Sequence, residues 1–214
     1  MSLLLDASEA RVLGALMEKE ATTPEYYPLS LNALVNACNQ KSNREPVVSY
    51  DDDTVMDALD RLREKKCSLT ITGNGRVHKY QQRISETLNL GRRESAVLCV
   101  LLLRGPQTLG EIKDRSERMH SFADLAEMEG TLDKLASWPD GHLVLKLPRQ
   151  PGQKEQRYTH LLCGEPDLEA MAEPGSAIGN APTRVDKLEQ ELNALRSELD
   201  ELKRRFESLE SQLR

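Results

Sequence analysis

The feature of this sequence that most constrains its fold is an internal repeat. Shifting the apolar face of the first expected helix forward along the chain reproduces a second apolar face, and the next two helices repeat in the same order. The offset changes only between elements, as differences in loop length produce. The matched residues are Glu9, Val12, Leu13, Leu16 and Met17 with Glu94, Val97, Leu98, Leu101 and Leu102, then Pro28, Leu31 and Leu34 with Pro106, Leu109 and Ile112, then Val55, Leu59 and Leu62 with Met128, Leu132 and Leu135. The chain therefore contains two copies of one structural unit.

Each copy is predicted to begin with three helices, because its apolar residues recur three and four positions apart. In the first copy the helices cover residues 6–20 and two segments within 31–62. Tyr26 and Tyr27, in the connection after the first helix, are expected to cover the edge of the core. Polar residues that can cap a helix N-terminus precede several helices. The expected caps are Asp6 with Glu9, Ser49 with Asp52, Thr108 with Glu111, and Ser121 with Asp124.

Two strands joined by a turn are expected after the helices of the first copy. Leu69 and Ile71 alternate with polar residues, which predicts a strand that buries these two side chains. The following Gly73-Asn74-Gly75 supplies the positive backbone angles of a tight turn. Residues 77–84 then return as the second strand. A phosphate-binding interpretation of the glycines would need a helix immediately after them, and strand-like residues follow instead.

The second copy has the same two strands at residues 143–147 and 158–162, with a longer turn between them. Three helices followed by a hairpin is the order of a winged helix, in which the hairpin forms the wing. We therefore predict an α+β fold, mainly helical, with two tandem winged-helix domains at residues 1–84 and 85–163.

The composition favours a soluble protein, with 38% hydrophobic and 30% charged residues and a formal net charge of −6. The longest apolar run, residues 96–103, is much shorter than the roughly 20 residues that cross a bilayer. The N-terminus also lacks the pattern of a secretory signal peptide. We expect a cytoplasmic protein, with no membrane partner.

The cysteines and histidines do not have the spacing of a metal site or a redox motif. The cysteines are Cys38, Cys67, Cys99 and Cys163. Cys38 and Cys99 lie on apolar helical faces, so they are interpreted as buried, reduced thiols that pack like small hydrophobic side chains. We expect no metal and no cofactor.

Several local motifs resemble the YceH-like family of uncharacterised bacterial proteins. The motifs are Thr22-Thr23-Pro24-Glu25, Tyr27-Pro28-Leu29-Ser30, the run from Ala37 to Val47, Leu101-Leu102-Leu103-Arg104-Gly105, and Arg157-Tyr158 followed by His160-Leu161. The resemblance spans roughly residues 5–165, and the long central run is its most specific part. It implies a tandem winged-helix fold and a bacterial cytoplasmic protein, and it implies no activity, substrate or catalytic residue.

The last part of the sequence is predicted to be a tethered coiled coil. Residues 164–184 are rich in proline, glycine, alanine and serine without periodicity, which indicates a flexible linker. An unbroken heptad pattern occupies residues 185–214 and predicts an oligomerisation helix. Its apolar seam is Val185, Leu188, Leu192, Leu195, Leu199, Leu202, Phe206, Leu209 and Leu213.

The charges beside this seam favour a parallel homodimer. In a parallel pair, each residue at heptad position g faces the residue at position e five places later in the partner helix. All of these pairs join opposite charges, as Glu191 with Arg196 and Glu198 with Lys203 illustrate. No buried asparagine fixes the number of strands, so a trimer stays open. A single amphipathic helix that folds back on its own domain is the other alternative, although the seam is narrower than is usual for such a helix.

Polar and basic residues of the first interhelical loop and of the two wings are candidates for nucleic-acid binding, because such side chains can contact phosphates and base edges. The candidates are Gln40, Lys41, Asn43, Arg44, Arg76, His78, Lys79, Arg149 and Lys154. The loop residues have a second interpretation, in which they cap helices or pair locally with residues 51–53.

The third helix of each copy argues against insertion into a major groove. In the first copy it begins with three aspartates at 51–53 and adds Asp57 and Asp60, so its first half repels phosphates. In the second copy the same helix is also mainly acidic. If DNA is bound, we expect the contacts to come from the 40–44 loop and the wings.

Two functions therefore fit the sequence. The first is a regulatory, transcription-related DNA-binding protein that acts as an oligomer, and the second is a scaffold that presents acidic helix faces to a protein partner. An enzyme is not expected, because the sequence contains no catalytic triad, metal cluster, dinucleotide fingerprint or P-loop in a recognisable context.

Overall fold

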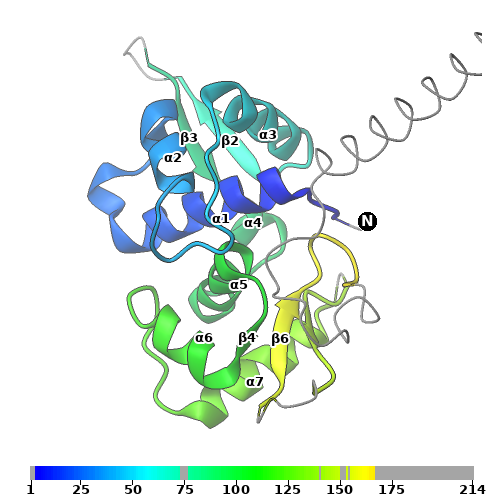
Figure 1. Ribbon diagram of the computed structural model, residues 1–214. Coiled ribbons are helices and arrows are strands. Elements are labelled where there is room, and N and C mark those ends of the chain that lie inside the picture. The colour runs from blue at the N-terminus through cyan, green and yellow to red at the C-terminus, as the bar shows by residue number, and fades with distance from the viewer. Residues whose placement is uncertain (1–2, 73–76, 140, 150–152, 154, 167–214) are drawn as a thin grey trace, which may run out of the picture. The chain divides into compact units, whose positions relative to one another are not determined.

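The computed structural model describes residues 3–72, 77–139, 141–149, 153 and 155–166. The chain divides into two compact units, Met1–Ala172 and Glu173–Arg214, and all the described residues belong to the first. The described part is an α+β structure of helices and small antiparallel sheets (Figure 1). None of its helices is both long and apolar enough to cross a membrane. The linker and the heptad segment expected at residues 167–214 lie outside the described residues.

The first repeat consists of three main helices and a three-stranded sheet. Its elements are α1 (Ala7–Thr22), the 3-10 turn η1 (Pro24–Tyr26), β1 (Leu29–Ser30), α2 (Leu31–Cys38), α3 (Asp52–Glu64), β2 (Ser68–Ile71) and β3 (Lys79–Gln82). The sheet order is β1-β3-β2, and both pairs are antiparallel. The short strand β1 was not predicted, because two residues are too few to show an alternating pattern.

The second repeat has the same order of elements after a short helix, α4 (Ile84–Thr87). Its elements are α5 (Arg92–Arg104), β4 (Gln107–Thr108), α6 (Leu109–Ser116), α7 (Leu125–Ala136), β5 (Val144–Lys146) and β6 (Arg157–His160). The sheet order, β4-β6-β5, also matches that of the first repeat. The internal repeat of the sequence is therefore a repeat of structure.

Local capping interactions start the helices, and two of the four expected caps are confirmed. Asp6 with Glu9 forms a capping box at α1, and Thr108 with Glu111 forms one at α6. The other two expectations were wrong by a few residues. Asp51 caps α3 in place of Ser49, and Asp124 itself caps α7. A short aspartate side chain next to the first turn reaches the free backbone N–H groups directly, which explains both shifts.

Two side-chain expectations in the first repeat were also wrong. Tyr26 does not cover the core, because it is 72% exposed, whereas the hydroxyl of Tyr27 accepts a hydrogen bond from the backbone N–H of Gln82 in β3. Strand β2 buries Ser68 and exposes Leu69, the reverse of the predicted face. The Ser68 hydroxyl donates to the backbone oxygen of Leu59 at 3.1 Å, so its burial leaves no unpaired polar group.

Helices α1 and α5 pack against each other and join the two repeats. The buried apolar residues of both repeats form one contiguous cluster. A Cβ atom added at Gly14 of α1 would lie 2.9 Å from two side-chain carbons of Leu103 in α5, so glycine permits a very close approach here. The thiol of Cys99 in α5 also donates to the Gly14 carbonyl at 3.4 Å. Cys38 and Cys99 are buried free thiols, as expected, and burial raises the pKa of Cys38 to about 12.

Lowering the pH from 7 to 5 is expected to destabilise the fold through His160 in β6. Burial lowers the pKa of this imidazole from 6.5 to about 4. Its Nδ1 atom is buried and has no hydrogen-bond partner among the described residues. At pH 5 the unfolded chain therefore binds a proton that the folded chain does not, and the free energy of unfolding falls by up to about 2 kcal/mol.

Urea unfolding at several pH values between 4.5 and 7 checks this expectation. Stability should be fully present above pH 6.5 and decline steadily below it in the wild-type protein. A His160→Gln variant should have a flatter profile. Identical pH profiles for wild type and His160→Gln would contradict the assignment.

Candidate nucleic-acid interface

The loop of residues 39–51, between α2 and α3, contains four of the predicted binding residues, and its arginine is buried. The side chain of Arg44 has no exposed surface. Its guanidinium group forms a bidentate ion pair with Glu18 of α1, at 2.6 and 3.2 Å, and also donates to the backbone oxygens of Ala37 and Asn43. Arg44 therefore holds the loop against α1 and is not accessible to DNA, which corrects the exposed position expected for it.

The other three loop residues differ in what they present to solvent. Asn43 has a left-handed backbone (φ 60°), and its Oδ1 accepts a hydrogen bond from Arg104 of α5. Gln40 is half-buried, and Lys41 is exposed. Among the described residues, Lys41 has no ion-pair partner. The loop thus offers one free positive charge where the sequence predicted two.

The same loop fastens the two repeats together. Besides the contact between Asn43 and Arg104, the backbone N–H of Glu45 donates to the carbonyl of Leu103 at 2.8 Å. Within the first repeat, Arg11 of α1 also holds this loop: it is buried and donates to the backbone oxygens of Cys38 and Pro46. The role of Arg11 in holding the loop was not predicted from the sequence. The available signal was the presence of Arg11 within the long apolar stretch of α1, where a charged side chain needs buried partners.

The first hairpin, β2 and β3, presents exposed polar and basic side chains. His78 is exposed and its Nδ1 lies 3.3 Å from the hydroxyl of Thr72. Lys79 is the first residue of β3, is exposed, and forms no ion pair within the described part of the chain. Arg76 lies outside the described residues. Of the three predicted residues of this wing, His78 and Lys79 are therefore both at the surface and next to each other.

The second hairpin, β5 and β6, has an exposed lysine that sequence reasoning missed. Lys146 lies at the end of β5, with its Nζ atom 5.4 Å from the ring centre of Tyr158, and hydrogen bonding to the Tyr158 side chain raises the pKa of the lysine. The strand alternation around Leu145 and Leu147 would have placed it on the outer face. Arg149 is exposed and donates from Nε to the backbone oxygen of Gln153 at 2.8 Å. Lys154 lies outside the described residues.

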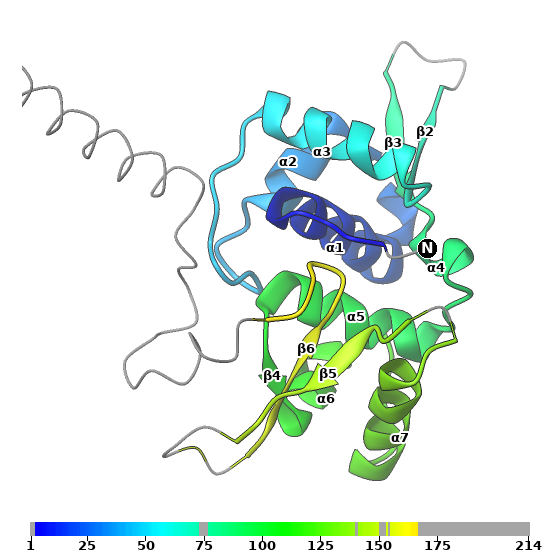
Figure 2. The same cartoon turned by 90° about the vertical axis from the view of Figure 1, so that its right-hand side faces the viewer.

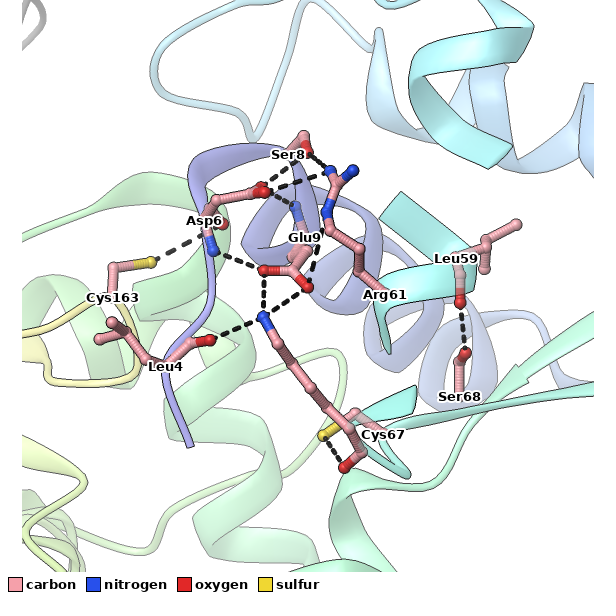
Figure 3. A network of polar contacts seen from close by, with 10 residues as sticks. Leu4, Asp6, Ser8, Glu9, Leu59, Arg61, Cys67, Ser68 and Cys163 are labelled. Atoms are coloured by element: carbon pink, nitrogen blue, oxygen red, sulfur yellow. Dashed lines mark hydrogen bonds and ion pairs between the residues drawn. The ribbon is translucent and has the colours of Figure 1, made fainter. Parts of the chain in front are cut away.

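Two basic residues at the end of α3, Arg61 and Lys65, form ion pairs with carboxylates at the start of α1. Glu9 is only 1% exposed, and Lys65 approaches its two carboxylate oxygens at 2.6 and 2.7 Å. Arg61 completes this network with an ion pair to Asp6 at 3.1 Å (Figure 3). Arg61 and Lys65 therefore stabilise the fold, whereas Arg63 is exposed and pairs with Asp60 of its own helix, and Lys66 is exposed.

The second repeat contains the corresponding interaction. Glu94, which matches Glu9 in the repeat, is buried and accepts a hydrogen bond from Lys134 of α7 at 2.6 Å. Burial alone would raise the pKa of Glu94, but the hydrogen bond and charge of Lys134 outweigh it and hold the pKa below its ordinary value. Lys65 after α3 and Lys134 of α7 thus form equivalent ion pairs, each with a buried glutamate in the first helix of its repeat.

The outer faces of these third helices are acidic. Asp52, Asp53, Asp57 and Asp60 of α3 are all exposed, and so are the acidic residues Glu129 and Asp133 of α7. These two helix faces are therefore mainly acidic, whereas both hairpins carry exposed basic residues, Lys79 and Lys146.

The predicted binding residues do not lie on a single surface. The loop of residues 39–51 runs from α2 toward α5, whereas strands β2 and β3 extend away from α5 on the other side of α1 (Figures 1 and 2). Figure 2 shows β5 and β6 on the opposite side of the α1 and α5 pair from β2 and β3. The predicted binding residues are therefore spread over different sides of the described structure.

Comparison with known proteins places the sequence in a family. The profile of the family described as "Protein of unknown function, DUF480" matches residues 5–153. A UPF0502 protein of Solibacter usitatus is 55% identical over 205 residues, which are 95% of this chain and 98% of that protein. The chain belongs to this family.

Other members have similar identity over nearly their whole length. A UPF0502 protein of Vibrio parahaemolyticus is 50% identical over 98% of this chain and 99% of its own. The UPF0502 protein YceH of Salmonella schwarzengrund is 48% identical over 92% of this chain and 95% of its own. The resemblance to the YceH-like family is therefore confirmed. The run of residues 37–47, which carried most of that resemblance, includes Asn43 and Glu45, whose contacts with Arg104 and Leu103 join the two repeats.

Proposed function

We propose that this protein is a non-enzymatic, cytoplasmic DNA-binding protein with two tandem winged-helix domains, and that its wings make the principal contacts. The architecture supports this proposal, because each repeat combines three main helices with a three-stranded antiparallel sheet that ends in a hairpin. Winged helices commonly bind DNA, but fold alone does not establish function, so the distribution of charge has to support the claim.

One observation carries the proposal. In the described part of the chain, the exposed cations without an ion-pair partner include Lys79 and Lys146 on the hairpins, whereas Lys65 and Lys134 of the third-helix regions are paired with buried glutamates. Phosphate contacts depend on cations that are free to approach the duplex backbone. The acidic faces of α3 and α7 repel that backbone, so the hairpins are the more favourable contact.

The heptad segment at residues 185–214 gives the proposal its oligomeric form. A parallel coiled coil would join two copies, so that hairpins from two chains could contact the same duplex. Linked sites bind more tightly than single sites when the linker spans the distance between them. The roughly 20-residue linker provides that reach if it behaves as a flexible coil.

Fluorescence anisotropy of the full-length protein with mixed-sequence duplex DNA, at low and at physiological salt, tests the proposal. We expect salt-sensitive binding, and we expect Lys79→Ala and Lys146→Ala each to reduce the slope of log affinity against log salt by about 1, because each variant neutralises one phosphate fewer. Arg92→Ala removes an exposed cation that lies at the start of α5 and not on a hairpin, and it should leave the slope unchanged. Arg44 is left intact because it is structural.

Two further variants sharpen the result. Asp57→Asn on α3 should not change binding if only the hairpins approach DNA, and stronger binding would indicate contact through the third helix instead. Leu195→Asp with Leu202→Asp should give a monomer by light scattering and weaker DNA binding. Absence of DNA binding by the wild-type protein even at low salt would refute the proposal, and the scaffold interpretation would then be the one to pursue.

A further inference from the structure

A small cleft with an excess of arginine lies between the two repeats, away from the hairpins. Its volume is about 210 Å³. Its walls are formed by the second half of α1, the loop before α3, the end of α5, and the second half of α6 with the residues that follow it. The polar residues that line it are Glu18, Asn43, Arg104, Asp114, Arg115 and Arg118. Both repeats contribute to the cleft, so it exists only because α1 and α5 pack together.

The acidic charge of Glu18 in this cleft is already neutralised. Both of its carboxylate oxygens bind the buried guanidinium group of Arg44, at 2.6 and 3.2 Å, and Lys19 lies 3.8 Å away. Arg115 is partly neutralised in turn by Glu111 of its own helix, at 3.6 Å. The paired groups therefore contribute little net charge to the cleft.

The remaining groups leave a positive charge. Arg104 and Arg118 form no ion pair with any described carboxylate, and exposed Asp114 is the one acidic lining group that also has none among the described residues. Arg104 is half-buried at the end of α5, and the partner that holds it is the uncharged Oδ1 atom of Asn43. Among the described residues no carboxylate lies within ion-pair distance of its guanidinium group, although the charges of Glu18 and Glu45 act on it from farther away.

Neighbouring arginines add to this imbalance. Burial lowers the pKa of Arg104, and the positive charges of Arg115 and Arg44 lower it further, although Glu18 and Glu45 act in the opposite direction. Holding several guanidinium groups close together is unfavourable unless an anion is present. Guanidinium groups donate in a planar fork that matches the oxygens of phosphate and carboxylate.

A larger cleft between the repeats, of about 540 Å³, does not have this character. It is lined by one arginine, Arg92, against two glutamates, and several of its polar groups pair with one another: Gln82 donates to Glu20 at 2.6 Å and Ser85 lies 3.1 Å from Ser95. The smaller cleft differs because three arginines line it, and two of them, Arg104 and Arg118, have no ion-pair partner among the described residues.

We propose that the arginine cleft binds a small multivalent oxyanion, such as a phosphate ester or a polycarboxylate, through Arg104, Arg115 and Arg118. The ligand is a free small molecule, since the cleft is small and lies between the repeats and not on a hairpin. Because both repeats form the walls, the bound anion holds α1 and α5 in their packed arrangement. This proposal does not depend on DNA binding.

Isothermal titration of full-length protein with pyrophosphate, at constant ionic strength, tests the proposal. The wild-type protein is expected to bind one pyrophosphate per chain and to show a higher melting temperature with it. Arg118→Gln removes an exposed side chain and should raise the dissociation constant about tenfold, and Arg104→Gln should raise it at least as much. Arg104→Lys keeps the charge but loses the fork, so its affinity should fall between wild type and Arg104→Gln.

The control variant is Arg92→Gln, which removes an exposed arginine outside this cleft and should bind like wild type. Melting curves without ligand show whether each variant is folded, and the exposed Arg118 serves as the decisive position if Arg104 variants unfold. A parallel titration with citrate distinguishes a carboxylate ligand from a phosphate ligand, and binding of either anion at the arginines supports the proposal.

Three results would overturn it. The first is no binding of pyrophosphate or citrate at millimolar concentration, and the second is equal weakening by Arg92→Gln and Arg118→Gln, which would indicate non-specific charge attraction. The third is displacement of pyrophosphate by mixed-sequence duplex DNA together with loss of DNA binding in Arg118→Gln. That result would assign the cleft to a nucleic-acid surface and not to a small ligand.

Discussion

Replacing Arg44 with alanine is expected to lower the free energy of unfolding by about 3–5 kcal/mol, because the change leaves a partly buried carboxylate without its partner. Glu18 is only 14% exposed, and Arg44 supplies its two shortest contacts. The same change removes the donors that bind the backbone oxygens of Ala37 and Asn43. The loop of residues 39–51 should therefore loosen from both α1 and α5.

Urea unfolding followed by circular dichroism measures this effect, with two comparison variants. Lys41→Ala, in the same loop, removes an exposed lysine and should change stability by less than about 0.5 kcal/mol. Glu18→Gln with Arg44→Met removes both charges and should be less destabilising than Arg44→Ala alone, since neither partner is then left unpaired. A decrease below about 1 kcal/mol for Arg44→Ala would show that the pair is not essential to the fold.

The Arg44 result also determines how DNA-binding experiments are interpreted. A variant that combines Lys41→Ala, Arg44→Ala and Lys79→Ala would fail to bind simply because the first repeat is destabilised. Variants at Lys79 and Lys146 avoid this ambiguity, because Lys79 and Lys146 are exposed and lie outside the loop.

Replacing Gly14 with leucine is expected to destabilise the protein by about 3 kcal/mol through overpacking between the two repeats. The Cβ atom alone would lie 2.9 Å from Leu103 Cγ and 3.2 Å from Leu102 Cβ, and leucine adds three more carbon atoms in the same direction. Leu102 Cβ is attached directly to the α5 backbone, so it cannot give way by rotation of a side chain. Helices α1 and α5 would have to move apart.

Gly130→Ala is the matched control for this prediction. Gly130 lies on the exposed surface of α7, and a Cβ atom there would meet nothing within 4 Å among the described residues. Alanine has the higher helix propensity, so this change should stabilise the protein by about 1 kcal/mol. Thermal or urea unfolding of both variants gives the comparison. A Gly14→Leu protein as stable as wild type would mean that the repeats do not depend on this close approach.

The sequence alone was informative about local structure. The apolar spacing of α1, α3 and α5 predicted their buried faces, and Asp6 with Glu9 predicted the first capping box, because these interactions join residues within one helical turn. The internal repeat followed from the same local patterns. The repeat also placed Glu94 at the position equivalent to Glu9, although α5 follows Gly91 and has no side-chain cap.

The candidate site was harder to predict because its chemistry depends on distant contacts. Nothing near Arg44 in the sequence indicates Glu18 as its partner, and nothing near Arg104 indicates Asn43. Leu69 and Ser68 show the same difficulty on a smaller scale. Alternation correctly separated two faces of β2, but the packing of α3 and the carbonyl of Leu59 decided which face is buried.

Patterns in the amino-acid sequence were sufficient to establish the main helices, the duplicated order of elements and the family. These features depend on interactions over a few residues, or on a pattern repeated along the chain. The folded structure was needed to show that Arg44 is a buried structural residue, that Lys65 and Lys134 pair with Glu9 and Glu94, and that Lys79, Lys146 and Arg118 are exposed without an ion-pair partner in the described part of the chain. The reason is physical: a charged side chain has the same identity in solvent and in an ion pair, and only the groups that fold around it decide which state it occupies.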